Sequence, residues 1–106
     1  MSETDQPEST TGTLERTDTK PRFAPHYHVI LLNDDYHSMP FVVMVIQKTI
    51  RCSLARAEEI MFEAHQRGRS ILWTGCLEQA ELKQEQVHSF REDEKGPLGC
   101  VLEPAA

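Results

Sequence analysis

The chain has 106 residues, and its 11 Lys and Arg residues against 17 Asp and Glu residues give it a formal net charge of −6. This length predicts one small domain with a thin core, and the acidic balance argues against binding to nucleic acid or to an anionic membrane surface. No apolar run approaches the roughly 20 residues of a membrane span, no secretory signal opens the chain, and the three widely spaced Cys residues predict a reduced, cytoplasmic protein without disulfides.

The first 22 residues differ in composition from the rest of the chain. Residues 1–20 hold six Thr, two Ser and five acidic residues, with Met1 and Leu14 as the only sizeable apolar side chains. A segment of this kind cannot bury enough surface to offset its ordering entropy. We therefore predict a disordered N-terminal extension over residues 1–22 and one folded domain over residues 23–106. A passive extension is the default interpretation of this composition.

The folded part opens with a strand, a turn and an apolar helix. Residues 27–32 are rich in β-branched and apolar side chains and predict the first strand, and the polar cluster 33–37 predicts a turn. Ser38 is a good N-cap, and Pro40 suits the first turn of a helix. The following residues predict a helix from residue 39 to about residue 51. Its high apolar density indicates burial on most sides or a ligand-binding face.

Two more helices and two more strands complete the predicted domain. The second helix follows the cap Ser53 and ends at Gly68, a residue that favours the left-handed conformation at a helix end. Residues 69–74 predict the second strand, residues 77–93 the third helix and residues 98–102 the last strand. The order β-α-α-β-α-β predicts an α+β open sandwich, in which three helices pack on one face of a three-stranded sheet.

The sequence contains none of the common catalytic motifs. It has no HExxH, no GxSxG and no Gly-rich phosphate loop. A Cys–His enzyme could pair Cys100 with His65, but nothing local supports that pairing, and a small buried thiol is the simpler interpretation. His26 and His28 share a strand face, yet two ligands do not make a metal site. We expect neither an enzyme nor a cofactor or metal.

One turn and one helix carry residues that suit a binding site. Met61, Ala64 and His65 share one helix face, and residues 33–35 form the acidic turn. Taken separately, the helix face is typical of a surface buried in the core with a hydrogen-bonded histidine, and residues 33–35 are typical of an ordinary turn. If the turn meets the helix, a carboxylate, an amide oxygen and a neutral imidazole converge as acceptors beside an apolar pocket. That chemistry suits the α-ammonium group of a protein N-terminus with its first side chain.

Several short motifs between Tyr27 and Leu102 together resemble the ClpS family, adaptors of the Clp ATP-dependent protease. The matching motifs are Leu32-Asn33-Asp34-Asp35-Tyr36, Met39 with Phe41-Val42, Gln47-Lys48, Ile60-Met61 with Ala64-His65, Gly68-Arg69, Glu78 with Ala80-Glu81 and Lys83, and Pro97-Leu98 with Cys100 and Leu102-Glu103. The resemblance covers about three quarters of the chain.

The resemblance implies a monomeric bacterial adaptor. It would bind proteins whose N-terminal residue is Leu, Phe, Tyr or Trp, the N-degron, and deliver them to a Clp AAA+ unfoldase. The residues implied to hold the α-amine are Asn33, Asp34 and His65. The implied pocket walls are Met39, Val42, Met61, Ala64 and Leu98. The positions implied to contact the N-terminal domain of the unfoldase are Glu78 and Lys83, and the N-terminal extension would engage the unfoldase during delivery.

Four positions depart from the pattern of the family. Ala64 stands for a usual Val, His37-Ser38 stands for a usual Thr-Pro, and Cys76 takes the place of a capping Thr. Cysteine is a poor helix cap. The alternative function is an adaptor that docks on a Clp unfoldase without binding N-degrons. Loss of an amine-binding residue would signal that alternative, and all three are present.

Overall fold

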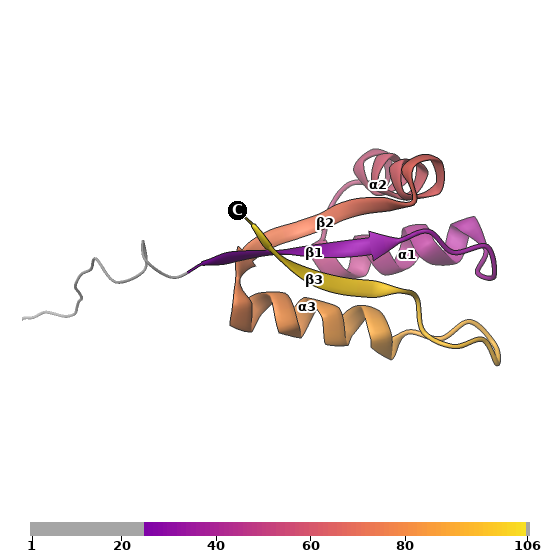
Figure 1. The fold of residues 1–106 in the computed structure, drawn as a ribbon. Coiled ribbons are helices and arrows are strands. Elements are labelled where there is room, and N and C mark those ends of the chain that lie inside the picture. The colour runs from indigo at the N-terminus through magenta and orange to yellow at the C-terminus, as the bar shows by residue number, and fades with distance from the viewer. Residues whose placement is uncertain (1–24, 106) are drawn as a thin grey trace, which may run out of the picture.

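Three strands and three helices follow one another in the predicted order β-α-α-β-α-β (Figure 1). The computed structural model describes residues 25–105, so the predicted extension over residues 1–22 lies outside the described residues. The elements are β1 (His26–Leu32), α1 (Met39–Ile50), α2 (Leu54–Arg67), β2 (Arg69–Cys76), α3 (Leu77–Ser89) and β3 (Cys100–Ala105). The α+β fold class is confirmed. In the described part of the chain, no helix has the length and apolar character that crossing a membrane requires.

The sheet is antiparallel, with β1 between β2 and β3. Val29 in the middle of β1 pairs with Trp73 on β2 and with Leu102 on β3. A bulge interrupts the β1–β2 pairing between Val29 and Ile30. Figure 1 shows α2 beside β2, α3 beside β3 and α1 behind the sheet, so that the sheet keeps one face free of helices.

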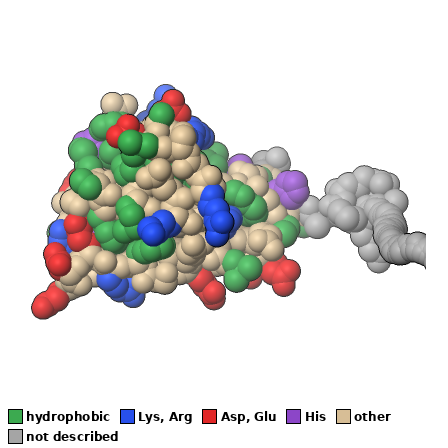
Figure 2. Space-filling view, turned by 180° about the vertical axis from the view of Figure 1, so that it is seen from behind, with side chains coloured by type: hydrophobic (Ala, Val, Ile, Leu, Met, Phe, Trp, Pro, Cys, Tyr) green, Lys and Arg blue, Asp and Glu red, His purple; other side chains and the backbone are tan. Residues whose placement is uncertain are grey.

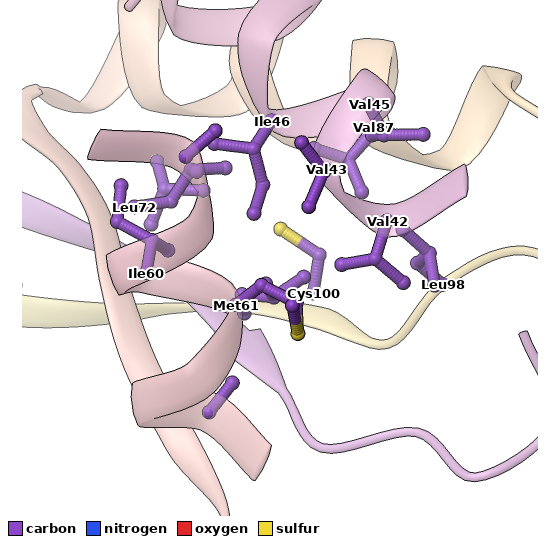
Figure 3. Packing of buried hydrophobic residues seen from close by; sticks show 14 of the residues in the cluster. Val42, Val43, Val45, Ile46, Ile60, Met61, Leu72, Val87, Leu98 and Cys100 are labelled. Carbon is purple, nitrogen blue, oxygen red and sulfur yellow. The ribbon is translucent and has the colours of Figure 1, made fainter. Parts of the chain in front are cut away.

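The helices cover the sheet face that carries Val29 and Leu31. These two side chains belong to one buried cluster with side chains from all three helices and from the other two strands. Figure 3 shows part of this cluster, in which Val42 of α1 lies beside Leu98 from the segment that precedes β3. This packing joins the start of α1 to the chain just before β3.

The open face of the sheet is closed over its centre by an ion pair. Ile30 points to this face, away from the helices, yet it is only 1% exposed. Arg69 on β2 forms a salt bridge with Glu103 on β3, and β1 lies between these two strands. The long Arg side chain must therefore cross β1, and its apolar stem can shield Ile30 from water.

The helix ends are set by local residues, as the sequence predicts. Ser38 Oγ accepts a hydrogen bond from the N–H of Phe41 at 3.3 Å, and Ser53 Oγ accepts one from Arg56 at 3.1 Å. Gly68 ends α2 with φ of 90°, a left-handed conformation that suits glycine. Cys76 makes no side-chain hydrogen bond at the start of α3, so the prediction of a poor cap is confirmed.

The chain after α2 departs from the predicted boundaries. The third helix ends at Ser89 and not near residue 93. Phe90 turns to an extended conformation and packs against the core, and Glu92 accepts hydrogen bonds from Ser38. These tertiary contacts override the helical pattern, because intrinsic helix propensity is a weak preference.

The remaining boundary errors concern the other elements. The last strand is Cys100–Ala105 and not 98–102, because Leu98 packs into the core and pairing with β1 begins at Cys100. Pro104 is tolerated there since β3 is an edge strand. The second strand continues past residue 74 to Cys76, the first strand begins one residue earlier at His26, and α1 ends at Ile50 because Arg51 adopts a left-handed conformation.

The Thr49→Val variant should be more stable than the wild type. Thr49 is 2% exposed, and its Oγ1 finds no hydrogen-bond partner among the described residues. A buried hydroxyl without a partner costs about 1–3 kcal/mol, and Val has the same shape without that hydroxyl. We expect a gain of about 1 kcal/mol in the free energy of unfolding, measured by urea denaturation. Thr49→Ser keeps the hydroxyl and loses the methyl group, so it should lose about 1 kcal/mol. A Thr49→Val protein less stable than the wild type would contradict the prediction.

Candidate functional site

A pocket of about 180 Å³ opens where the end of β1, the start of α1, the end of α2 and the chain before β3 meet. All eight residues predicted for the substrate site line this one pocket. The lining residues are Leu31, Leu32, Asn33, Asp34, Asp35, His37, Met39, Val42, Met61, Ala64, His65 and Leu98. The structure therefore brings together the acidic turn and the apolar helix face that the sequence leaves apart.

Two backbone hydrogen bonds hold the turn between α2 and the chain before β3. The N–H of Asn33 donates to the carbonyl of Gly68, which ends α2, at 2.9 Å. The N–H of Leu32 donates to the carbonyl of Gly99 at 3.0 Å. Consecutive residues at the end of β1 are thus fixed to the two segments that carry His65 and Leu98. These two backbone contacts hold the turn against both segments.

The walls of the pocket are apolar, and one of them is exposed. Val42, Met61, Ala64 and Leu98 are buried, whereas Met39 at the start of α1 is 47% exposed. Met39 and Met61 also line a second, wider groove of about 400 Å³ between α1 and α2. Figure 2 shows apolar side chains gathered over this part of α1 and α2. Met39 lies at the border of the two cavities, where an unbranched side chain can move.

The Asp34 carboxylate is largely occupied by its own turn. Its Oδ1 accepts hydrogen bonds from the N–H groups of Tyr36 at 2.6 Å and His37 at 3.0 Å, and its Oδ2 lies 2.7 Å from His37 Nδ1. Burial raises the pKa of Asp34, but the hydrogen bonds from Tyr36 and His37 outweigh it and hold this pKa below its ordinary value. An ionised carboxylate has about four acceptor positions, so one remains for a ligand.

Asn33 and His65 are less engaged than Asp34. Both are exposed at the rim, and within residues 25–105 their side chains make no hydrogen bond. The Asn33 amide oxygen and a neutral His65 nitrogen are free acceptors. With the last position on Asp34, they offer three acceptors above an apolar pocket. This arrangement can bind an ammonium group that carries a hydrophobic side chain.

Four lining residues were not predicted for the site. Leu31 and Leu32 look like plain strand residues, and Asp35 looks like part of the turn. His37 is visible in the sequence as a departure from the ClpS pattern. Its side chain is 3% exposed, and its ring stacks on Phe41 with centroids 5.2 Å apart. That departure is the one signal that could have pointed to it.

The two residues predicted to contact an unfoldase lie on α3, outside the pocket. Glu78 is exposed in the first turn of α3. Lys83 is half-buried, since its Nζ donates to the carbonyl of Thr49 at 3.2 Å and lies 5.5 Å from the centre of the Trp73 ring. The ammonium group of Lys83 therefore binds the end of α1 to the sheet, and Glu78 is the freer of the two side chains.

The thiols and histidines do not form a catalytic or metal centre. Burial raises the pKa of the Cys100 thiol to about 11, so it stays protonated at neutral pH. Cys100 packs in the core, whereas His65 is exposed at the pocket rim. Among residues 25–105, no three His, Cys, Asp or Glu side chains lie close enough together to hold a metal ion. The polar groups of the pocket are suited to binding.

Sequence comparisons agree on one family. The model of the family described as "ATP-dependent Clp protease adaptor protein ClpS" matches residues 22–101. The ATP-dependent Clp protease adapter protein ClpS of Xanthomonas campestris pv. campestris (strain 8004) is 43% identical over 89 residues, which cover 82% of this chain and 84% of that protein. The protein of the same name from Ruegeria sp. (strain TM1040) is 37% identical over 103 residues, covering 97% of this chain and 91% of that one.

A solved structure has the same fold. It is that of Agrobacterium tumefaciens ClpS2 bound to L-phenylalaninamide, with a TM-score of 0.72 and 30% sequence identity. The similarity covers 76% of this chain and 98% of the ClpS2 chain. Almost all of the ClpS2 chain is therefore matched by about three quarters of this one.

The Asp34→Asn variant should be less stable, in a pH-dependent way. A carboxylate whose pKa is lowered on folding stabilises the fold above its unfolded pKa, and this contribution is lost as the pH falls through the lowered value. We expect a loss of about 1–3 kcal/mol at neutral pH, because Asn cannot replace the acceptor that faces His37 Nδ1. The deficit should shrink as the pH falls below the ordinary value of 3.8. Urea denaturation at several pH values measures it.

Asp35→Asn is the matched control, since Asp35 is exposed in the same turn. It should change the free energy of unfolding by less than about 0.5 kcal/mol at every pH. Equal behaviour of the two variants would show that the hydrogen bonds to Asp34 do not stabilise the turn.

Proposed function

The chain belongs to the ClpS family of ATP-dependent Clp protease adaptors, which are not enzymes, and we propose that it recognises N-degrons and delivers them to a Clp AAA+ unfoldase. The substrates are proteins that begin with Leu, Phe, Tyr or Trp. The observation that carries the proposal is the pocket itself, in which free acceptors stand at the rim of an apolar cavity. An N-terminal residue has the complementary chemistry, an ammonium group next to a side chain.

The amine is assigned to Asn33, Asp34 and His65. A buried ammonium group needs acceptors for its three N–H bonds, and these residues offer three. L-Phenylalaninamide, the ligand of the similar ClpS2, combines a free α-amine with an aromatic side chain. That ligand supports the same assignment for this chain. A His65 nitrogen accepts a hydrogen bond from the amine only through its lone pair.

The first side chain is assigned to the apolar walls. Val42, Met61, Ala64 and Leu98 are buried and would surround it, and Met39 would lie over the entrance. Burial of a large apolar side chain contributes roughly 1.5–3 kcal/mol, which favours Leu, Phe, Tyr and Trp over small residues. The pocket therefore explains a preference for size, and the rim explains a preference for a free N-terminus.

Delivery requires a second surface, and we assign it to α3. Glu78 is exposed there, and Lys83 lies on the same helix, although its ammonium group is already bound within the domain. We propose that the N-terminal domain of the unfoldase contacts this helix, with the N-terminal extension assisting delivery. An adaptor that docks without binding N-degrons is the alternative, and peptide titration separates the two.

A peptide with an acetylated N-terminus should bind at least tenfold more weakly than the same peptide with a free amine. Acetylation removes the charge and two of the donors, so it leaves rim acceptors desolvated without partners, a cost on the order of 2 kcal/mol or more. The measurement is calorimetric titration with two Phe-initiated peptides that differ only in acetylation. Equal affinities would reject the pocket as an N-degron site and favour the docking-only alternative.

The Met39→Ala variant should accept Ile and Val as N-terminal residues. A β-branched side chain carries its bulk on Cβ, close to the rim where Met39 would press, whereas Leu and Phe branch further out. Affinity for Leu-initiated peptides should fall only modestly. The test titrates peptides beginning with Leu, Ile and Val against the wild type and the variant. Continued rejection of Ile and Val would show that Met39 is not the gate.

The Ala64→Val variant should shift the preference from Trp or Phe toward Leu. Val adds two methyl groups to the pocket wall, which fill space that a Leu side chain leaves empty, and each buried CH₂ contributes roughly 0.8 kcal/mol. The ratio of the Trp and Leu affinities, measured on the wild type and on the variant, reports this change. An unchanged ratio would remove Ala64 from the wall without affecting the assignment of Met39.

A further inference from the structure

The His37 imidazole lies between two hydrogen-bond acceptors. Its Nδ1 is 2.7 Å from Asp34 Oδ2, and its Nε2 is 2.8 Å from the carbonyl oxygen of Gly96. A carbonyl oxygen can only accept, and so can an ionised carboxylate. Both ring nitrogens must then carry protons, which makes His37 an imidazolium unless Asp34 itself holds a proton.

Asp34 is the ionised partner at neutral pH. Its other oxygen accepts two backbone N–H groups, from Tyr36 and from His37, an arrangement that favours the carboxylate. The pKa of Asp34 accordingly lies below its ordinary value. The His37 side chain is 3% exposed, so water has little access to its contact with Asp34, whereas Gly96 lies at the surface. A neutral His37 ring would leave the lone pair of one ring nitrogen facing one of the two acceptors, an arrangement with no hydrogen bond and a mutual repulsion.

The other groups around the ring also favour a positive charge. Phe41 of α1 stacks on it, and the face of an aromatic ring attracts a cation. From the segment that precedes β3, Glu92 accepts hydrogen bonds from the N–H of Ser38 at 2.9 Å and from its hydroxyl at 2.6 Å. Lys95 is paired with that same carboxylate at 3.5 Å.

The pocket itself adds one carboxylate and one further titratable ring. Asp35 lies in the same turn, and His65 of α2 lines the same cavity. Of these carboxylates, Asp34 contacts the His37 ring directly, Asp35 lies in the same turn, and Glu92 is bound to the neighbouring Ser38.

We propose that His37 is a positioning residue, whose imidazolium clamps the Asp34 carboxylate to the Gly96 carbonyl and so fixes the separation of two pocket walls. Asp34 belongs to the rim, and Leu98, two residues after Gly96, forms the facing wall. The inference rests on the proposed function, because the cavity that the clamp shapes is the one assigned to the N-terminal residue. Loss of one proton turns one of the two contacts into a repulsion between acceptors and loosens the wall.

The clamp depends on the residue type at this position. A Thr, which the ClpS pattern usually has here, carries one hydroxyl proton and cannot donate to both acceptors. Ser38, the neighbouring departure, binds Glu92 in the same segment. The two substituted positions therefore hold one and the same piece of chain, residues 92–96, against the start of α1.

The protonation state is tested first, on the wild-type protein alone. Ring ¹⁵N spectra at about pH 7.5, where a free His is mostly neutral, should show both His37 nitrogens protonated. His28, whose Nδ1 contacts the hydroxyl of Thr74 on the open face of the sheet, is the internal reference. One unprotonated nitrogen on His37 at this pH would overturn the inference. This measurement does not depend on whether any variant folds.

The positioning role is tested by peptide binding. His37→Gln should lower the affinity for a Phe-initiated peptide about tenfold or more at neutral pH. The reason is that the two charge-assisted hydrogen bonds of the imidazolium, to Asp34 and to Gly96, are lost. The matched control His28→Gln should change the affinity less than twofold. A second control, Gly96→Ala, keeps the carbonyl and has open space at the new Cβ, so it should bind like the wild type. Equal affinity of His37→Gln and the wild type would overturn the clamp.

A pH series separates a positioning role from a general loss of stability. The ratio of the wild-type affinity to the His37→Gln affinity should fall toward one at the pH where the spectra show His37 losing a proton. Titration of the peptide amine cancels in this ratio. A ratio that does not vary with pH would overturn the clamp. A doubly protonated His37 in a protein that binds no N-degron peptide would instead overturn the proposed function.

Discussion

The pocket depends on the anchoring of one turn by its backbone. Leu32 and Asn33 are adjacent, and their N–H groups donate in opposite directions, to Gly99 and to Gly68. The first contact continues the pairing of β1 with the chain before β3, and the second joins β1 to the end of α2. Gly68 is at the C-cap of α2 with φ of 90°, where a side chain would be strained. The helix can therefore end at the residue whose carbonyl accepts the hydrogen bond from the N–H of Asn33.

This anchoring explains why a small domain can hold a stable pocket. Apolar walls in water tend to collapse onto one another, and a chain of this size has little core to resist such collapse. Here the wall residues are also part of the hydrophobic core. Val42 and Met61 pack in the buried cluster, and Leu98 packs beside Val42 (Figure 3). The exposed Met39 is the exception, and it lies at the border of a second groove. Met39 is thus the wall residue whose unbranched side chain has the most room to move.

The sequence predicted which residues line one pocket better than it predicted the element boundaries. Asn33, Asp34 and His65 belong to motifs that resemble those of the ClpS family, and this resemblance implies that the three residues lie close together. Their convergence on one pocket could therefore be expected. The end of α3 could not, since it depends on where Phe90 packs and on a contact between Glu92 and Ser38 that spans 54 positions. The same limit applies to His37. Its ring contacts the carbonyl of Gly96 across 59 positions. Every residue has a backbone carbonyl, so the sequence does not indicate which one accepts the hydrogen bond.

Asp34 connects the architecture of the pocket with its chemistry. Three of its roughly four acceptor positions are used by the turn and by His37, and one faces the cavity. If His37 is an imidazolium, it also balances the charge of this carboxylate. A ligand amine then meets one remaining lone pair on Asp34 and the neutral acceptors of Asn33 and His65, and not an unpaired carboxylate. The ligand ammonium is itself charged, so its hydrogen bonds to all three acceptors are charge-assisted, and the hold on the amine is spread over them. An adaptor must also release what it carries. Discrimination between ligands in this pocket then depends on the fit of the side chain and on the positions of the acceptors more than on a single strong ion pair.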